Sequence, residues 1–230
     1  MAFPSGYTTS DILVLVIETA NDWVSSLWTT NLTNNGWARA ANSNTIYGGA
    51  NTAANVTYMD VWWSRPTTTS QTAVILGDAG DHTLAVCAAF ANCITTGDPW
   101  DTGTAAGINV KVGVATAQVN SFAVTTATAN TLILTVINSP QDIAAGRINA
   151  GATLLLVGGS GGDTELTEQC DFGTTSGGGG TIAILTHRKP TAGATANVRA
   201  NTTIANTALI WTGALIGLAD AKPWCQITWV

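Results

Sequence analysis

Charged residues are scarce in this chain of 230 residues, and those present are mostly acidic. Asp, Glu, Lys and Arg make up 10% of the sequence, against roughly 25% in an ordinary globular protein. This scarcity excludes a coiled coil and a charge-rich disordered protein. The formal net charge is −6, whereas proteins that wrap DNA or bind anionic membranes are usually basic. We therefore expect no nucleic-acid partner.

Long apolar runs are also missing, although 46% of the residues are hydrophobic. No run approaches the roughly 18 uninterrupted apolar residues of a membrane span. The first apolar run, from Ile12 to Ile17, is short and is flanked by Asp11 and Glu18. The sequence thus predicts neither a signal peptide nor a membrane partner, and we expect the chain to fold in the cytoplasm where it is made.

Cysteine is sparse and scattered, at Cys87, Cys93, Cys170 and Cys225. There is no Cys-x-x-Cys pair, so neither a zinc ribbon nor a thioredoxin-type site is predicted. Reduced thiols in the core are the simplest interpretation. A bridge between Cys87 and Cys93 across a bend remains the alternative.

Short runs rich in β-branched residues, separated by Gly, Asn, Asp and Pro, fill the rest of the sequence. This pattern is typical of an all-β sandwich or barrel. Nine segments carry it: Asp11–Thr19, Val56–Arg65, His82–Ala91, Ile108–Val119, Thr131–Asn138, Thr153–Val157, Thr181–Arg188, Ala196–Thr203 and Thr207–Leu218. We find no linker, charge run or repeat, so residues 1–230 are expected to form a single domain. The segment Asp163–Phe172, between two glycine clusters, is interpreted as an exposed excursion between strands.

Two segments allow a finer prediction. Val56–Arg65 carries bulky side chains on both of its alternating faces, which indicates a central strand covered on both sides. Ala205–Leu218 has some helical spacing, but its β-branched residues and two glycines favour a strand. No helix of three turns is predicted anywhere.

Groups that could perform catalysis are few. Asp78, Asp81 and His82 lie within five residues and could hold a hard cation or act as a general base. Turns at the aspartates, followed by a strand, are the simpler interpretation. The cluster Gly158–Gly162 lacks the lysine of a phosphate-binding loop and is interpreted as a flexible loop. We therefore predict a protein that is not an enzyme and has no cofactor or metal.

Tryptophan is abundant, with nine in the chain. Strand patterns place Trp62, Trp63 and Trp211 in the core. The motif around Trp100 is best explained by a Gly-Asp-Pro turn followed by a packed indole. The alternative is a glycan-stacking site made of Asp98, Trp100 and Asp101.

The segment 223–230 alternates like a strand, with Ile227 and Trp229 on one face and Trp224 on the other. Left in water, this apolar area would be unfavourable, so the segment is expected to pair with a sheet. Either both faces are covered within the same chain, or Trp224, Ile227 and Trp229 contribute to an assembly interface.

A series of further motifs follows in order along the chain: Ser10–Asp22, Asp60–Arg65, Gly80–Leu84 running into Ala89-Phe90, Thr96–Asp101, Thr125-Thr126 before Asn130–Thr135, and Ala208–Leu215. Together they resemble a family of structural proteins of tailed bacteriophages. The family often has Phe-Arg-Gly where this chain has Phe90-Ala91-Asn92, so no contact from that arginine is expected.

The resemblance implies a jelly-roll-like β-sandwich that is part of the virion, made in the host bacterial cytoplasm. The leading hypothesis is a capsid decoration or cement protein, a homotrimer that binds across subunits of the major capsid protein. One alternative is a tail or fibre-tip protein that binds host-surface glycans. Another is a virion-associated hydrolase that uses Asp78, Asp81 and His82. The motifs do not distinguish a place on the head from one on the tail.

Overall fold

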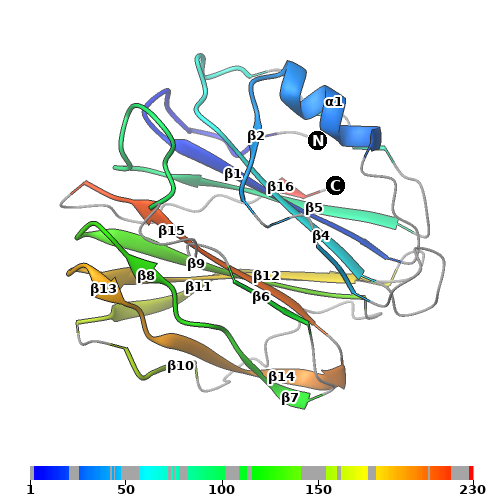
Figure 1. Ribbon diagram of the computed structural model, residues 1–230. Helices are drawn as coiled ribbons and strands as arrows, with labels where there is room; N and C mark the ends of the chain where they lie inside the picture. The colour runs from blue at the N-terminus through cyan, green and yellow to red at the C-terminus, as the bar shows by residue number, and fades with distance from the viewer. Residues whose placement is uncertain are drawn as a thin grey trace.

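The computed structural model contains, in its described part, sixteen strands and one helix. The described residues are 3–20, 26–41, 43, 45–47, 57–71, 74, 76–77, 82–101, 109–112, 116–140, 154–159, 162–175, 180–206, 208–218 and 228–229. Two large antiparallel sheets lie face to face, one above the other in Figure 1. The predicted all-β sandwich is therefore confirmed.

The first sheet is built around β1 (Ile12–Ala20). This strand pairs with β4 (Thr57–Ser64) on one side and with β5 (His82–Phe90) on the other. Two short strands, β2 (Ala38–Arg39) and β3 (Thr45–Tyr47), pair with the far edge of β4. The strand β16 (Thr228–Trp229) pairs with the far edge of β5.

The second sheet repeats this arrangement around β9 (Thr131–Ser139). That strand lies between β12 (Gly180–Lys189) and β15 (Leu209–Ile216). The strand β11 (Thr164–Thr174) extends the sheet beyond β12, and β6 (Asn109–Val112) extends it beyond β15. Each large sheet thus comes from one stretch of the chain, apart from β16, and in each the first long strand lies in the middle.

The main hydrophobic core fills the space between the two sheets. Alternate residues of a strand point to opposite faces, so each inner strand contributes every second side chain to this core. Its strand residues are Ile12, Val14, Val16, Met59, Val61, Leu84, Val86, Ala88, Phe90, Leu132, Leu134, Val136, Cys170, Ile182, Ile184, Leu209, Trp211 and Leu215.

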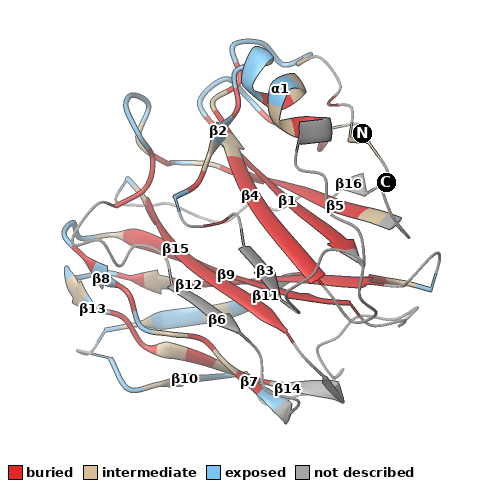
Figure 2. Ribbon diagram, turned by 45° about the vertical axis from the view of Figure 1, so that its right-hand side comes forward, coloured by how far each residue is buried: buried red, intermediate tan, exposed pale blue. Residues whose placement is uncertain are grey.

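Further layers cover the outer faces of both sheets. The helix α1 (Ser26–Asn34) packs Trp28 and Leu32 on the outer face of the first sheet. A small sheet of β7 (Thr116–Asn120), β10 (Leu155–Val157) and β14 (Asn197–Asn206) covers the second. A two-stranded sheet, β8 (Thr125–Thr126) with β13 (Gly193–Ala194), lies at one end. The central strands are therefore buried on both faces, as the red ribbons of Figure 2 show, and this confirms the interpretation of Val56–Arg65.

Parts of the fold differ from the sequence-based expectation. The expected strand Ile108–Val119 is divided between β6 and β7, which belong to different sheets. The segment interpreted as an exposed excursion is the edge strand β11, whose first half is largely exposed. It pairs with β12 through main-chain hydrogen bonds, which require no apolar alternation. The sequence predicts no helix of three turns, and α1, with nine residues, is shorter than that. Among its described side chains, Trp28 and Leu32 belong to the core, which is too few to give a helical pattern in the sequence. The prediction of β15 as a strand is confirmed.

Candidate functional site

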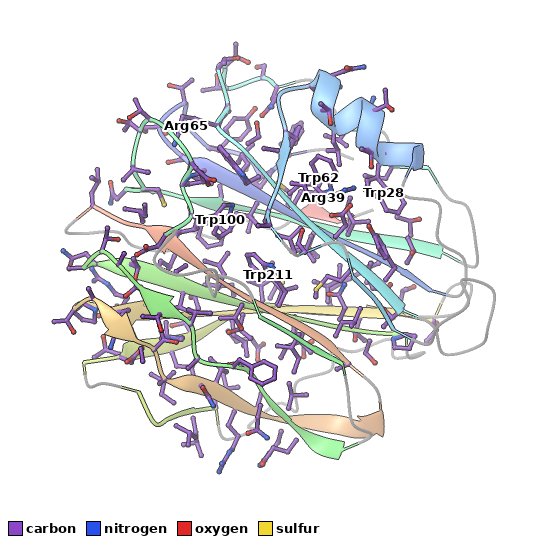
Figure 3. All side chains as sticks on the ribbon, in the orientation of Figure 1. Trp28, Arg39, Trp62, Arg65, Trp100 and Trp211 are labelled. Carbon is purple, nitrogen blue, oxygen red and sulfur yellow. The ribbon has the colours of Figure 1, made fainter. Side chains whose placement is uncertain are left out.

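The loop around Trp100 is a packed turn. The Asp98 carboxylate accepts a hydrogen bond from the Trp100 backbone N–H at 3.0 Å. The Trp100 ring meets that of Trp211 edge to face, with centroids 5.2 Å apart, and is 7% exposed. Figure 3 shows the two labelled side chains together between the sheets. The turn with a packed indole is therefore present. The glycan-stacking alternative stays a prediction, although little of the Trp100 surface is exposed.

Asp101 joins this loop to the turn after β8. Its carboxylate accepts hydrogen bonds from the backbone N–H groups of Ala127 and Thr128 and from the Thr128 hydroxyl, at 2.8 to 3.1 Å. The side chain is buried, and these donors lie well away from it in sequence. Asp101 therefore holds two loops together.

The expected strand near residue 230 is present in β16. Thr228 and Trp229 pair with Cys87 and Val86 of β5. Trp224, Ile227 and the side chain of Trp229 lie outside the described residues, so their part in an assembly interface stays a prediction.

The catalytic alternative falls largely outside the described residues, which do not include Asp78, Asp81 or the side chain of His82. The backbone of His82 opens β5, opposite Ala20.

Cys87, Cys93 and Cys170 are buried and form no disulfide, as predicted for reduced core cysteines. Burial raises the pKa of Cys93 to about 12. Cys225 lies outside the described residues.

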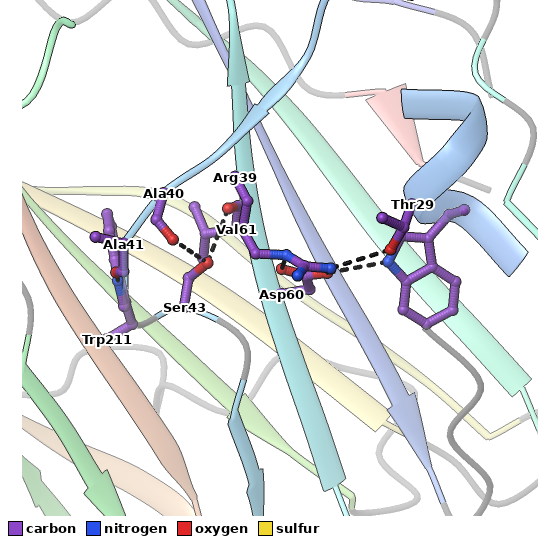
Figure 4. A network of polar contacts seen from close by, with 9 residues as sticks. Thr29, Arg39, Ala40, Ala41, Ser43, Asp60, Val61 and Trp211 are labelled. Atoms are coloured by element: carbon purple, nitrogen blue, oxygen red, sulfur yellow. Dashed lines mark hydrogen bonds and ion pairs between the residues drawn. The ribbon is translucent and has the colours of Figure 1, made fainter. Parts of the chain in front are cut away.

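A buried carboxylate, Asp60 of β4, anchors the layer that covers the first sheet (Figure 4). The Trp28 indole N–H donates to it at 3.0 Å, and Arg39 donates at 3.1 Å while its Nε lies 3.0 Å from the other oxygen. The Arg39 guanidinium also lies 4.6 Å from the ring centre of Trp62. Burial raises the pKa of Asp60, and the bonds from Trp28 and Arg39 oppose that rise. The network connects α1 and β2 to β4.

A second group of buried charged and polar side chains lies at one end of the second sheet. Lys189 Nζ lies 3.2 Å from Asp163 Oδ2, and His187 Nε2 lies 3.2 Å from Asp163 Oδ1. All three side chains are buried, with exposed fractions of 0% for Lys189, 5% for Asp163 and 1% for His187. We call these three residues the His–Asp–Lys cluster.

The register of the sheet explains how the cluster forms. His187 and Lys189 are two residues apart on β12, so both point to the same face. Thr164 of β11 pairs with Arg188 of β12, which brings the preceding residue, Asp163, opposite Lys189. Asp163 thereby meets two residues that lie more than twenty positions later in the sequence.

A glycine turn closes over the cluster. Gly159 has a φ of +93°, and a Cβ at this position would lie 2.7 Å from the backbone nitrogen of Ala196 and 3.1 Å from Asp163 Oδ2. Only glycine fits there without a shift of the backbone. This part of the glycine cluster, interpreted from the sequence as a flexible loop, is thus a close-fitting cover.

The electrostatics of the cluster keep its imidazole neutral. Burial lowers the pKa of His187 to about 4; the Lys189 ammonium adds to this effect, and the Asp163 carboxylate opposes it. Nδ1 of His187 has no hydrogen-bond partner among the described residues, and its Nε2 lies 3.2 Å from Asp163 Oδ1 without the orientation of a hydrogen bond. The cluster therefore combines an amine, a carboxyl group and a neutral base within a covered site.

The described residues contain no group of three or more His, Cys, Asp or Glu side chains placed to hold a metal ion. No helix in the described part of the chain has the length and apolar character to cross a membrane. Comparison with known protein families, with curated proteins and with solved structures found no match.

Proposed function

We propose that this chain is a structural component of a tailed-bacteriophage particle, and specifically a capsid decoration protein. In this role it binds as a homotrimer across neighbouring subunits of the major capsid protein. The observation that carries the proposal is that buried carboxylates connect segments of the fold that are distant in sequence.

Three buried carboxylates each join segments that are distant in sequence. Asp60 connects α1 and β2 to β4, Asp101 connects two loops, and Asp163 connects the start of β11 to β12. Breaking a buried pair of this kind is strongly destabilising, so these contacts resist local opening. A layered sandwich braced in this way suits a part that must keep its shape in a particle.

The resemblance to tailed-phage structural proteins supports the same proposal. The family often has glycine at the position of Asn92, and Asn92 here has a φ of 57°. Glycine and asparagine are the residues that tolerate this left-handed conformation best. Asparagine at residue 92 can therefore adopt the left-handed backbone conformation that a glycine at this position would also allow.

The test is to label purified virions with an antibody against this chain and to locate the label by electron microscopy. We expect label over the head. Label confined to the tail would contradict decoration, and particles without label would contradict a virion function.

A reconstitution experiment checks the stabilising role. Particles assembled without this chain should release their DNA at a lower temperature than normal particles, and adding the purified chain should restore the normal release temperature. Serum albumin added at equal concentration is the control. Unchanged release in the absence of the chain would contradict a cement role.

A further inference from the structure

The His–Asp–Lys cluster holds a primary amine against a carboxyl group in a covered site. Lys189 Nζ donates a hydrogen bond to Asp163 Oδ2 at 3.2 Å, and the two side chains are 0% and 5% exposed. An ion pair buried this deeply loses much of its hydration, and this desolvation can cost more free energy than the attraction between the charges returns. Forming a neutral product would remove that cost.

We propose that Lys189 and Asp163 condense to an intramolecular isopeptide bond. A proton first passes from the Lys189 ammonium to the Asp163 carboxylate, which leaves a neutral amine and a carboxylic acid. The amine lone pair then attacks Asp163 Cγ, forming the Nζ–Cγ bond. The Cγ–Oδ1 bond breaks, and Oδ1 leaves with two protons as one water molecule. No oxidant, reductant or other reactant is consumed.

His187 is placed to carry the proton in this reaction. Its Nε2 lies 3.2 Å from Asp163 Oδ1, the oxygen that leaves. Because burial keeps the imidazole neutral above about pH 4, it can take up a proton that the reaction releases and pass it to the departing oxygen. We therefore assign His187 the role of general base and then general acid.

The surroundings favour the bond once it has formed. Gly159 lies close to both Asp163 and Ala196, which limits the access of water that would hydrolyse an amide. The bond would tie the start of the edge strand β11 to β12, at the end where the exposed half of β11 begins. This inference goes beyond the proposed function and does not depend on it.

Intact mass spectrometry of the denatured full chain tests the proposal. We expect a mass lower than that of the unmodified sequence by one water molecule. A tryptic digest should contain a branched peptide that joins Ile148–Arg188 to Lys189–Arg199. A full sequence mass would overturn the proposal, and so would a water loss confined to the Ile148–Arg188 peptide.

Variants distinguish the Lys189–Asp163 bond from other reactions that remove a water molecule from the chain. Lys189→Arg keeps the cation but cannot form the same amide, so it should have the full mass; the matched control Lys111→Arg should keep the water deficit. A deficit that persists in Lys189→Arg would overturn the proposal. His187→Gln should slow the bond formation about a hundredfold, measured as the crosslinked fraction against time after synthesis. An unchanged rate would overturn the role assigned to His187.

Discussion

Gly213 of β15 lies beneath the indole of Trp211, and replacing it by alanine tests how tightly the core is packed. A Cβ at residue 213 would overlap Cη2 of Trp211 and would lie 2.7 Å from Cζ2 and 2.9 Å from Cζ3 of the same ring. The indole has little room to tilt, because it is fully buried and meets the ring of Trp100 edge to face. The added methyl group therefore forces either the ring or the strand to move.

The expected cost of Gly213→Ala follows from two opposing effects. Overpacking a filled core costs about 1–3 kcal/mol, and such short contacts favour the upper end. In the opposite direction, alanine within a strand stabilises the fold by about 0.5–1 kcal/mol relative to glycine, because it loses less conformational freedom on folding. We therefore expect the free energy of unfolding to fall by about 2 kcal/mol, measured by urea denaturation followed by tryptophan fluorescence.

A double-mutant cycle isolates the contact with the ring. Trp211→Phe removes the outer ring atoms that the new methyl group would meet, so in that background Gly213→Ala should cost little. The two substitutions should then couple by at least about 1 kcal/mol. A neutral Gly213→Ala, or a cycle in which the two effects add, would refute the reasoning.

Three further predictions concern buried polar groups. Asp60→Ala removes the partner of Arg39 and should lower the free energy of unfolding by about 3 kcal/mol in urea denaturation; a loss below 1 kcal/mol would contradict the bracing role. The pKa of His187 is lowered from 6.5 to about 4 on folding, so between these values the unfolded chain binds the extra proton and stability falls as the pH falls. Between pH 6.5 and pH 4 the free energy of unfolding should fall by roughly 3 kcal/mol for this reason. Denaturation curves of His187→Gln over the same pH range should lack this fall. In a Cys225→Ser chain, thiol reagents at pH 8 should react only after unfolding, because Cys93 and the other described thiols are buried; fast labelling of the native chain would contradict this.

The long strands of the two central sheets could be predicted from the sequence because they are buried on both faces. Runs such as Ile12–Ile17 and Thr131–Ile137 are continuously apolar or β-branched, which is the pattern that burial on both faces requires. The edge strand β11 could not be predicted in this way. Its first half is exposed, so polar side chains such as Glu165 and Glu168 are tolerated there and the alternation is lost.

The turn at Asp98 could be predicted because its signal is local. The contact of Trp100 with Trp211 and that of Asp101 with Ala127 depend on how distant segments pack, and no spacing along the chain encodes them. The His–Asp–Lys cluster shows the same limit. The alternation of His187 and Lys189 is visible in the sequence, but the approach of Asp163 follows only from the register of β11 on β12.

The order of the strands also has a consequence for how the protein forms during synthesis. The long strands of the first sheet are complete before any strand of the second has been made. Their inner face carries Val14, Val61 and Val86, which meet the second sheet in the finished fold. A ribosome-bound chain would therefore present this apolar face for the time needed to translate the second sheet, when a chaperone or another nascent chain could bind it. The strand β16 joins β5 only after the whole second sheet has been translated, so the first sheet to begin forming is also the last to be completed.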